Sequence, residues 1–245
     1  VHAPEFDFEK DPENVKKALK MYEVDWPVIL DNKLEIWNLY ANHYWPAKYL
    51  LDHNGKIIYS HFGEGNYIET EIKIQEALKE AGYKVDDKLV SGLQGDSWEA
   101  GQTPELYFGS LRGYVENIPQ DIAIGSDQIY TTGSWIQEKE YLQHVRQTKD
   151  LDDLIILSYR AKKVFLVMES EDSKPVKVYV TLDGVGLNKD NEGEGIKFDE
   201  AGRSYVEVQF STLYNLISTQ TFGDHILRLS TTSDKLRCFA FTFGS

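Results

Sequence analysis

The sequence predicts an α/β domain followed by an all-β domain. Up to about residue 82, apolar residues at helical spacing alternate with short extended runs. After about residue 107, short extended runs recur between turn signals, which is typical of a β-sandwich or jelly roll. We therefore expect domains at residues 1–83 and 107–245. A glycine-punctuated stretch at 84–106 without sustained periodicity is expected to link them.

The first helix is expected to begin at Pro12, because Asp11 is a favourable N-cap residue and proline is favoured in the first helical turn. A later helix is expected to end at Gly82, where glycine commonly stops a helix. The other elements expected in this half are an extended run at 26–30, a helix at 34–44, hairpin strands at 47–51 and 57–62 around His53-Asn54-Gly55, and the helix from about 68 to 81 that Gly82 closes.

The second half is expected to hold at least seven strands and one short helical turn at Leu213–Ile217. The expected strands lie at 128–132, 153–158, 163–168, 176–182, 204–210, 225–229 and 237–243. Turn signals such as Asp183-Gly184 separate them.

Charge and composition narrow the range of partners. The chain has 40 acidic and 26 basic residues, for a net charge of −14. Nucleic acid and anionic membrane surfaces need clustered lysine and arginine, and the sequence has no such cluster, so neither is an expected partner. The single cysteine, Cys238, cannot form an internal disulfide or a CxxC pair. Its alternating neighbours favour a small buried residue over a reactive thiol.

We interpret the chain as a fragment of a longer protein. No apolar run approaches the length of about 18 residues that a membrane span needs, and no secretory leader opens the chain. The opening residues Val1-His2-Ala3-Pro4 instead look like the end of a strand.

The stretch around Trp45-Pro46 carries the most local information. Here an X-Pro bond precedes an apolar strand, a glycine hairpin and a closing helix. One interpretation is that the proline is an ordinary trans proline that opens an edge strand. The same order also matches the second half of a thioredoxin-like fold. The surrounding residues favour the second interpretation, because they resemble DipZ-type thioredoxins at Val1–Glu9, Asp31-Asn32 with Ile36-Trp37, Asn42–Pro46 and His61–Tyr67.

The resemblance covers about residues 1–82 and implies part of a TlpA-like thioredoxin fold. Proteins of this type join a CcdA-like membrane electron transporter to an extracytoplasmic thioredoxin-like domain and a C-terminal β-domain. The family thus implies thiol–disulfide exchange with substrate proteins in the periplasm or at the cell surface, in a protein anchored to the membrane. Its first strand and W-C-x-x-C turn would precede Val1, so this chain is expected to be inactive alone. The missing strands would also leave a sheet edge open to chain–chain pairing.

The family implies roles for three residues of the groove. In the family the proline equivalent to Pro46 is cis and faces the cysteine pair, and Trp45 would shape the groove for a substrate peptide. Glu5 would accept a proton near the buried cysteine, or it is an exposed loop acid. His43 and His61 are interpreted as surface or packing residues.

The second half resembles the DipZ C-terminal domain at Thr103–Gly109 and Phe239–Gly244, and that domain is similar to a jelly-roll carbohydrate-binding module. Aromatic residues on such a face could stack on a cell-wall glycan, or they could pack in the core. The candidates are Trp98, Tyr107, Tyr114, Tyr130 and Trp135.

No cofactor or metal is expected. The acidic stretch containing Asp183, Asp190, Glu192 and Glu194 has calcium-type ligands, but its spacing misses the EF-hand pattern, and a solvated turn is favoured. Three functions remain open: part of a thiol–disulfide oxidoreductase, a glycan-binding module, and a structural docking segment.

Overall fold

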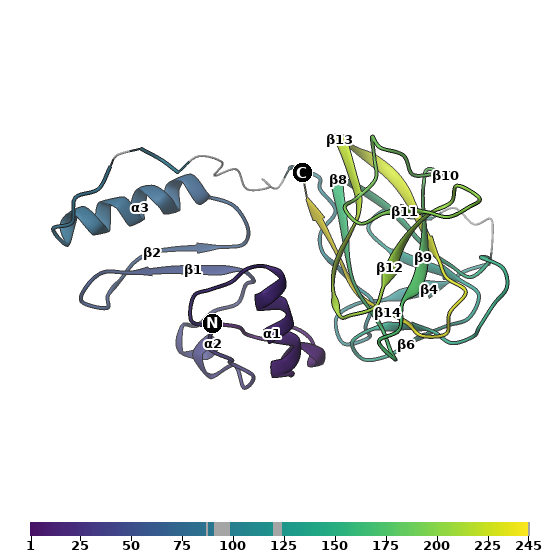
Figure 1. The fold of residues 1–245 in the computed structure, drawn as a ribbon, viewed down its shortest axis with the longest axis horizontal. Coiled ribbons are helices and arrows are strands. Elements are labelled where there is room, and N and C mark those ends of the chain that lie inside the picture. The colour runs from purple at the N-terminus through teal and green to yellow at the C-terminus, as the bar shows by residue number, and fades with distance from the viewer. Residues whose placement is uncertain (87, 91–98, 120–123, 245) are drawn as a thin grey trace. The chain divides into compact units, whose positions relative to one another are not determined.

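The computed structural model describes residues 1–86, 88–90, 99–119 and 124–244. The chain divides into two compact units, Val1–Ser97 (unit 1) and Trp98–Ser245 (unit 2), and each is described by itself (Figure 1).

Unit 1 is the α/β part of the chain. Its elements are η1 (Asp7–Lys10), α1 (Pro12–Met21), α2 (Glu35–Leu39), β1 (Ala47–Leu51), β2 (Ile57–Phe62) and α3 (Tyr67–Glu80). The antiparallel β1–β2 hairpin lies between α3 on one side and α1 and α2 on the other (Figure 1). The side chain of Asp11 accepts a hydrogen bond from the backbone N–H of Glu13 at the start of α1, as its N-cap position predicts.

Helix α2 is shorter than the helix predicted at 34–44. Leu34 and Ala41, which flank it, both have positive φ angles, of 57° and 48°. These left-handed residues interrupt the helical hydrogen bonding on either side, so only about one and a half turns form. The predicted extended run at 26–30 forms one parallel bridge, between Leu30 and His2.

Unit 2 is a β-sandwich. Its strands are β3 (Leu106–Tyr107), β4 (Val115–Asn117), β5 (Ile129–Thr132), β6 (Trp135–Gln137), β7 (Leu142–His144), β8 (Leu154–Ser170), β9 (Val176–Leu182), β10 (Val185–Gly186), β11 (Lys197–Phe198), β12 (Ser204–Val208), β13 (Thr212–Ser230) and β14 (Leu236–Gly244). The long strands β8 and β13 pair along most of their length, with register shifts at Asn215/Ile217 and Ser218/Gly223, and contribute to both layers (Figure 1). One layer adds β14, β7, β6 and β3, and the other adds β9, β12, β11, β10, β5 and β4.

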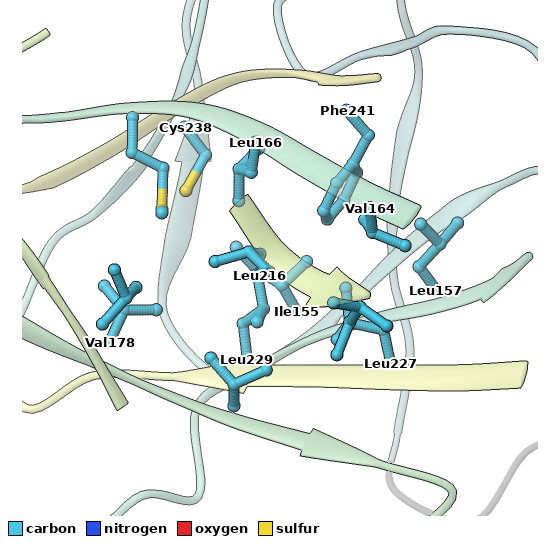
Figure 2. Close-up of a cluster of buried hydrophobic side chains, with 14 of the residues drawn as sticks. Ile155, Leu157, Val164, Leu166, Val178, Leu216, Leu227, Leu229, Cys238 and Phe241 are labelled. Carbon is cyan, nitrogen blue, oxygen red and sulfur yellow. The ribbon is translucent and has the colours of Figure 1, made fainter. Parts of the chain in front are cut away.

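The core of unit 2 is formed by the inward-facing residues of these strands. Alternate residues of β8 and β9 are buried, as expected for strands with one face toward a core. Figure 2 shows Leu157, Leu166 and Val178 from these strands beside Leu216, Leu229 and Phe241, all at most 1% exposed.

Two expectations for unit 2 are corrected. The helical turn predicted at Leu213–Ile217 is part of β13, where Leu213 pairs with Val167 and Tyr214 with Leu166. A register shift between Asn215 and Ile217 buries both Leu216 and Ile217, and these adjacent apolar residues mimic a helical pattern in the sequence. The strands predicted at 153–158 and 163–168 are one strand, β8.

Part of the linker expected at 84–106 bonds to unit 2. The backbone N–H of Thr103 donates to the carbonyl oxygen of Arg160, and Gln102 Nε2 donates to the carbonyl oxygen of Phe243. Lys162 also pairs with Glu99 at 3.3 Å. These contacts attach the segment from Glu99 onward to the sandwich.

Candidate functional site

The loop before β1 carries the predicted groove residues of unit 1. The Trp45–Pro46 peptide bond is cis. Trp45 is 46% exposed, its Nε1 donates to the carbonyl oxygen of Ala3 at 3.1 Å, and its ring lies 4.2 Å from that of Trp37 between centroids. The loop is therefore held against the N-terminal segment and α2 at the same time.

Asp31 fixes α2 beneath this loop. Its buried carboxylate accepts hydrogen bonds from the backbone N–H groups of Trp37, at 2.8 Å, and Ile36, at 3.2 Å. Burial acts to raise the pKa of Asp31, but these hydrogen bonds outweigh it and leave the pKa lowered. The ionised form therefore caps the helix that presents Trp37.

A pocket of about 540 Å³ opens between β1, the N-terminal segment and α2. Its walls are largely apolar and aromatic, and its polar members include Asp31 and Asn42. Trp45 and Pro46 line it, and so do Trp37, Tyr40, Tyr44 and Tyr49.

The carboxylate that is withdrawn from water near this loop belongs to Glu9, which sequence reasoning did not select. The backbone N–H of Glu5 donates to Glu9 Oε2 at 2.6 Å. Burial raises the pKa of the Glu9 carboxyl, and Glu5, whose side chain is half-buried, adds a like charge. His2 Nε2 lies 3.0 Å from the carbonyl oxygen of Glu9. The sequence of residues 1–9 contains the acids Glu5, Asp7 and Glu9 but does not show which carboxylate folds back.

The remaining reactive side chains considered, His43, His61 and Cys238, do not line this pocket. His43 is exposed, and His61 Nε2 lies 3.4 Å from the carbonyl oxygen of Glu64. Cys238 is fully buried in the core of unit 2, where Figure 2 shows its sulfur among aliphatic side chains. Burial raises the pKa of the Cys238 thiol, so this residue does not supply a thiolate.

Unit 2 has a second pocket, of about 490 Å³, which is lined by two of the five stacking candidates. Tyr107 and the 68%-exposed Tyr114 line it, together with Glu105, Arg112 and Gln128. The guanidinium of Arg112 lies 3.9 Å from the centre of the Tyr107 ring, and Tyr107 Oη donates to Glu105 at 2.6 Å. Aromatic faces and hydrogen-bonding groups therefore meet in one place.

Trp135 and Tyr130 do not line this pocket. Trp135 packs its ring 4.7 Å from that of His144, and its Nε1 donates to the carbonyl oxygen of Thr132. Tyr130 is buried, with 7% of its surface exposed. Trp98 lies outside the described residues.

A buried charged cluster stands beside Trp135, and sequence reasoning missed it. Asp153 accepts hydrogen bonds from His144 Nε2 at 2.8 Å and from Arg146 Nε at 2.7 Å. The Arg146 guanidinium, and after it His144, lowers the pKa of Asp153 to about 2 despite burial. Because Asp153 and His144 are each at most 1% exposed, the cluster joins segments of the fold rather than facing a ligand.

The acidic side chains considered for calcium do not gather at one site in the described residues. Asp183 pairs with His225 at 2.8 Å, whereas Asp190 and Glu194 are exposed. In the described part of the chain, no three His, Cys, Asp or Glu side chains gather where they could hold a metal ion. Within the same residues, none of the helices combines the length and apolar character of a membrane span.

Residues 103–244 match the family described as "Thioredoxin like C-terminal domain". The chain belongs to this family. The match lies on the β-sandwich and covers more than half of the chain.

The relatives extend the similarity into unit 1. Protein DipZ of Mycobacterium tuberculosis and that of Mycobacterium bovis are each 34% identical to the chain over 184 residues, or 69% of its length. The chain spans only 26% of those proteins. The chain is thus a DipZ-type thioredoxin-like portion with a β-domain. SUPPRESSOR OF QUENCHING 1 of Arabidopsis thaliana is 31% identical over 84 residues, which are 34% of this chain and 8% of that protein.

Solved structures with some similarity to the chain include two carbohydrate esterases of family two. The enzyme from Cellvibrio japonicus is 10% identical with a TM-score of 0.35, and an active-site mutant from Clostridium thermocellum is 15% identical with a TM-score of 0.36. Each covers 48% of this chain, and the chain covers 31% of each. At these scores no argument rests on the likeness.

Proposed function

We propose that unit 1 is the substrate-groove half of an extracytoplasmic thiol–disulfide oxidoreductase domain, completed by a CxxC-bearing segment from outside this chain. The supporting observation is the 540 Å³ aromatic-lined pocket beside the cis Trp45–Pro46 bond. The DipZ relatives, at 34% identity, supply the reaction class.

Exposed apolar side chains on β2 and α3 support the proposal that further strands cover the β1–β2 hairpin. In the described residues β1 pairs with β2 alone, and a two-stranded sheet is marginal in water without further strands. Ile57, Ile58 and Phe62 of β2 are 40–47% exposed, and Ile68 and Ile72 of α3 are 50% and 40% exposed. A segment that adds strands and fills the pocket would cover this surface.

The completed site would exchange disulfides by attack of a CxxC thiolate on a substrate disulfide, which gives a mixed disulfide and releases the substrate's other thiolate. The second CxxC thiolate then attacks the mixed disulfide, so the CxxC pair is oxidised and the substrate is reduced by two electrons. Trp45 and Pro46 would contact the substrate beside the cysteines. Glu9, with its raised pKa, is better suited than Glu5 to exchange a proton there.

The parent protein would place this reaction outside the cytoplasm. Electrons would reach the CxxC pair from a membrane electron-transfer domain of the same protein, as the DipZ resemblance implies. The CxxC pair would react with disulfides of substrate proteins. The parent protein would anchor the chain to the membrane.

Titration of the chain with a polypeptide that carries the CxxC-bearing segment of the parent tests the proposal. Tryptophan fluorescence should report saturable binding, because Trp37 and Trp45 line the pocket. Trp45→Ala should weaken binding at least tenfold. Trp26→Ala, which removes a 65%-exposed indole outside the pocket lining, should leave binding unchanged. Failure of the segment to bind the wild-type chain would refute the proposal.

A second function, glycan binding by unit 2, is favoured by the convergence of Tyr107, Tyr114 and Arg112 in the 490 Å³ pocket. A sugar ring could stack on Tyr114 while Glu105 and Gln128 bond its hydroxyl groups. Trp135 is a poor candidate because its ring and its Nε1 both contact the protein. Titration with soluble cell-wall polysaccharide should saturate in the wild type and fail in Tyr114→Ala, with Trp26→Ala as the control. Binding that survives in Tyr114→Ala would exclude this pocket. If neither the CxxC segment nor the polysaccharide binds, the docking-segment alternative remains.

A further inference from the structure

Asn42 is a buried amide in the lining of the 540 Å³ pocket of unit 1, and neither proposed function assigns it a role. It lies between α2 and the loop that carries Trp45 and Pro46, and only 7% of its surface is exposed. Burying an amide costs free energy unless its polar groups find hydrogen-bond partners. The partners of Asn42 therefore indicate what the residue does.

Asn42 bonds to three separate parts of unit 1. Its backbone N–H donates to the carbonyl oxygen of Trp37 in α2 at 3.0 Å. Its side-chain Nδ2 donates to the carbonyl oxygen of Tyr44 in the loop at 2.9 Å. Its Oδ1 accepts a hydrogen bond from the hydroxyl group of Tyr49 in β1 at 3.0 Å. One residue thus ties the loop both to α2 and to β1.

These contacts fix which way the amide faces. The carbonyl oxygen of Tyr44 can only accept, so it requires the Nδ2 group, and Oδ1 is left for the hydroxyl of Tyr49, which can donate. An ionised aspartate can only accept and could not serve the Tyr44 carbonyl. The two bonds therefore need the amide itself rather than a carboxylate of the same shape.

Tyr49 gives this bridge a fixed anchor. Its ring contacts that of Tyr40 at 4.9 Å and that of Phe62 at 5.8 Å between centroids, both in edge-on arrangements. Phe62 belongs to β2, which pairs with β1. The hydroxyl group that bonds to Asn42 is thus held by the β1–β2 hairpin.

The carbonyl of Tyr44 belongs to the peptide group that leads into Trp45. Because a peptide group is planar, holding its oxygen also orients the backbone N–H of Trp45. After Pro46 the loop is held by Gly63, whose backbone N–H donates to the Pro46 carbonyl oxygen at 2.8 Å. Asn42 and Gly63 therefore fix the backbone on the two sides of the Trp45–Pro46 bond.

We propose that Asn42 is a positioning residue for protein substrates, which holds the backbone of Trp45 and Pro46 where a substrate polypeptide passes. The inference rests on the proposed function of unit 1 and adds that the loop favours a polypeptide disulfide over a small one. A protein substrate must lie along the loop while its disulfide meets the CxxC thiolate, whereas a small disulfide needs only the thiolate. Misplacing a substrate-binding group by about 1 Å can slow a reaction by about a hundredfold, so loosening the loop should penalise the protein substrate selectively.

Single-turnover kinetics on a longer chain of the parent protein that includes the CxxC pair tests this selectivity. The pre-reduced chain is mixed with a disulfide-bonded test protein or with hydroxyethyl disulfide. In each reaction the CxxC dithiol becomes a disulfide and the substrate disulfide becomes two thiols, and mass spectrometry after alkylation follows the oxidation of the CxxC pair. Asn42→Asp should slow the reaction with the protein about tenfold and change that with hydroxyethyl disulfide by less than about twofold.

Two further variants sharpen the comparison. Tyr49→Phe removes the hydroxyl that bonds to Asn42 but keeps the ring, so it should also slow the protein reaction alone, by a smaller factor. Asn14→Asp is the matched control, because Asn14 Nδ2 donates to the carbonyl oxygen of Phe8 at 2.9 Å but Asn14 does not line the pocket. It should keep both wild-type rates.

Equal slowing of the two reactions in Asn42→Asp would reduce Asn42 to a role in stability and overturn the proposal. A wild-type ratio of the two rates in Tyr49→Phe would overturn it as well, and this conservative variant decides the matter if Asn42→Asp does not fold. A wild-type longer chain that reacts with neither disulfide would refute the proposed function of unit 1 together with this inference. An active wild type whose rate ratio survives the substitutions would refute the role of Asn42 alone.

Discussion

The rings of Trp37 and Trp45 lie 4.2 Å apart, and Trp45 also donates its Nε1 proton to the carbonyl oxygen of Ala3. This pair connects α2, the N-terminal segment and the cis-proline loop. Because both residues line the 540 Å³ pocket, the pair sets the shape of the surface that we assign to the completed redox domain.

Removing the ring of Trp37 should release that of Trp45. An aromatic pair contributes about 1 kcal/mol beyond its buried area, so Trp37→Ala should lower the free energy of unfolding of unit 1 by about 1–2 kcal/mol. It should also increase acrylamide quenching of the remaining tryptophans. The control Trp26→Ala should change stability by less than about 0.5 kcal/mol. Equal effects of the two substitutions would contradict a role for the pair.

Asp153 is expected to be the most sensitive charged residue of unit 2. Asp153→Asn keeps the shape of the side chain but removes the charge that His144 and Arg146 share. Breaking a buried pair from one side typically costs about 3–5 kcal/mol, and because Arg146 is half-exposed we expect about 3 kcal/mol in urea denaturation. Asp224→Asn, which breaks an exposed pair with Arg160, should cost less than about 1 kcal/mol.

The lowered pKa of Asp153 predicts how the stability of unit 2 depends on pH in acid. Its pKa is about 2 in the folded chain, against 3.8 for an ordinary aspartate. Because the folded pKa is the lower one, the contribution of Asp153 is complete above about pH 4 and is lost as the pH falls from 4 to 2. The difference corresponds to about 2 kcal/mol, which thermal unfolding across this range should show. In Asp153→Asn that part of the acid dependence should disappear, and its persistence there would assign it to other carboxylates.

Gly133 makes room for the cluster. Its φ angle is +84°, and a Cβ at this position would lie 1.9 Å from Asp153 Oδ1. Gly133→Ala should therefore destabilise unit 2 by more than about 2 kcal/mol, because it combines an unfavourable backbone angle with a clash. Gly202→Ala has a similar φ of +76° with open space around it, so it isolates the backbone effect, at about 1 kcal/mol. Comparable losses in the two variants would show that the clash is relieved without cost.

The sequence predicted the elements whose signals are local. The hairpin at 47–62 follows from the His53-Asn54-Gly55 turn, in which Gly55 has a φ angle of +81°. The structure adds Asp52, whose Oδ1 accepts the backbone N–H groups of Asn54 and Lys56. The start of α1 at Pro12 follows from Asp11 in the same way. The strands of unit 2 that alternate strictly, such as β9, were also recognisable.

Features that depend on distant partners were not recognisable. The segment at Leu213–Ile217 is a strand only because β8 pairs with it across a bulge. His144 gave no signal, because its contacts are with Asp153 and with the β13–β14 turn. Trp135 was selected as a stacking residue, but its packing against His144 was not recognisable. Glu9 was overlooked in favour of Glu5, since only the folded turn shows which carboxylate accepts the backbone N–H.

The most direct test compares the disulfide reductase activity of this chain with that of a longer chain from the parent protein that includes the residues preceding Val1, using dithiothreitol as the electron donor and a disulfide-bonded test protein as the substrate. The account predicts no activity above the dithiothreitol background for the 245-residue chain, whose one thiol is buried. It predicts catalytic reduction by the longer chain, with a loss of at least tenfold in its Trp45→Ala variant. Equal activity of the two wild-type chains, or an inactive longer chain that is correctly folded, would contradict the central claim.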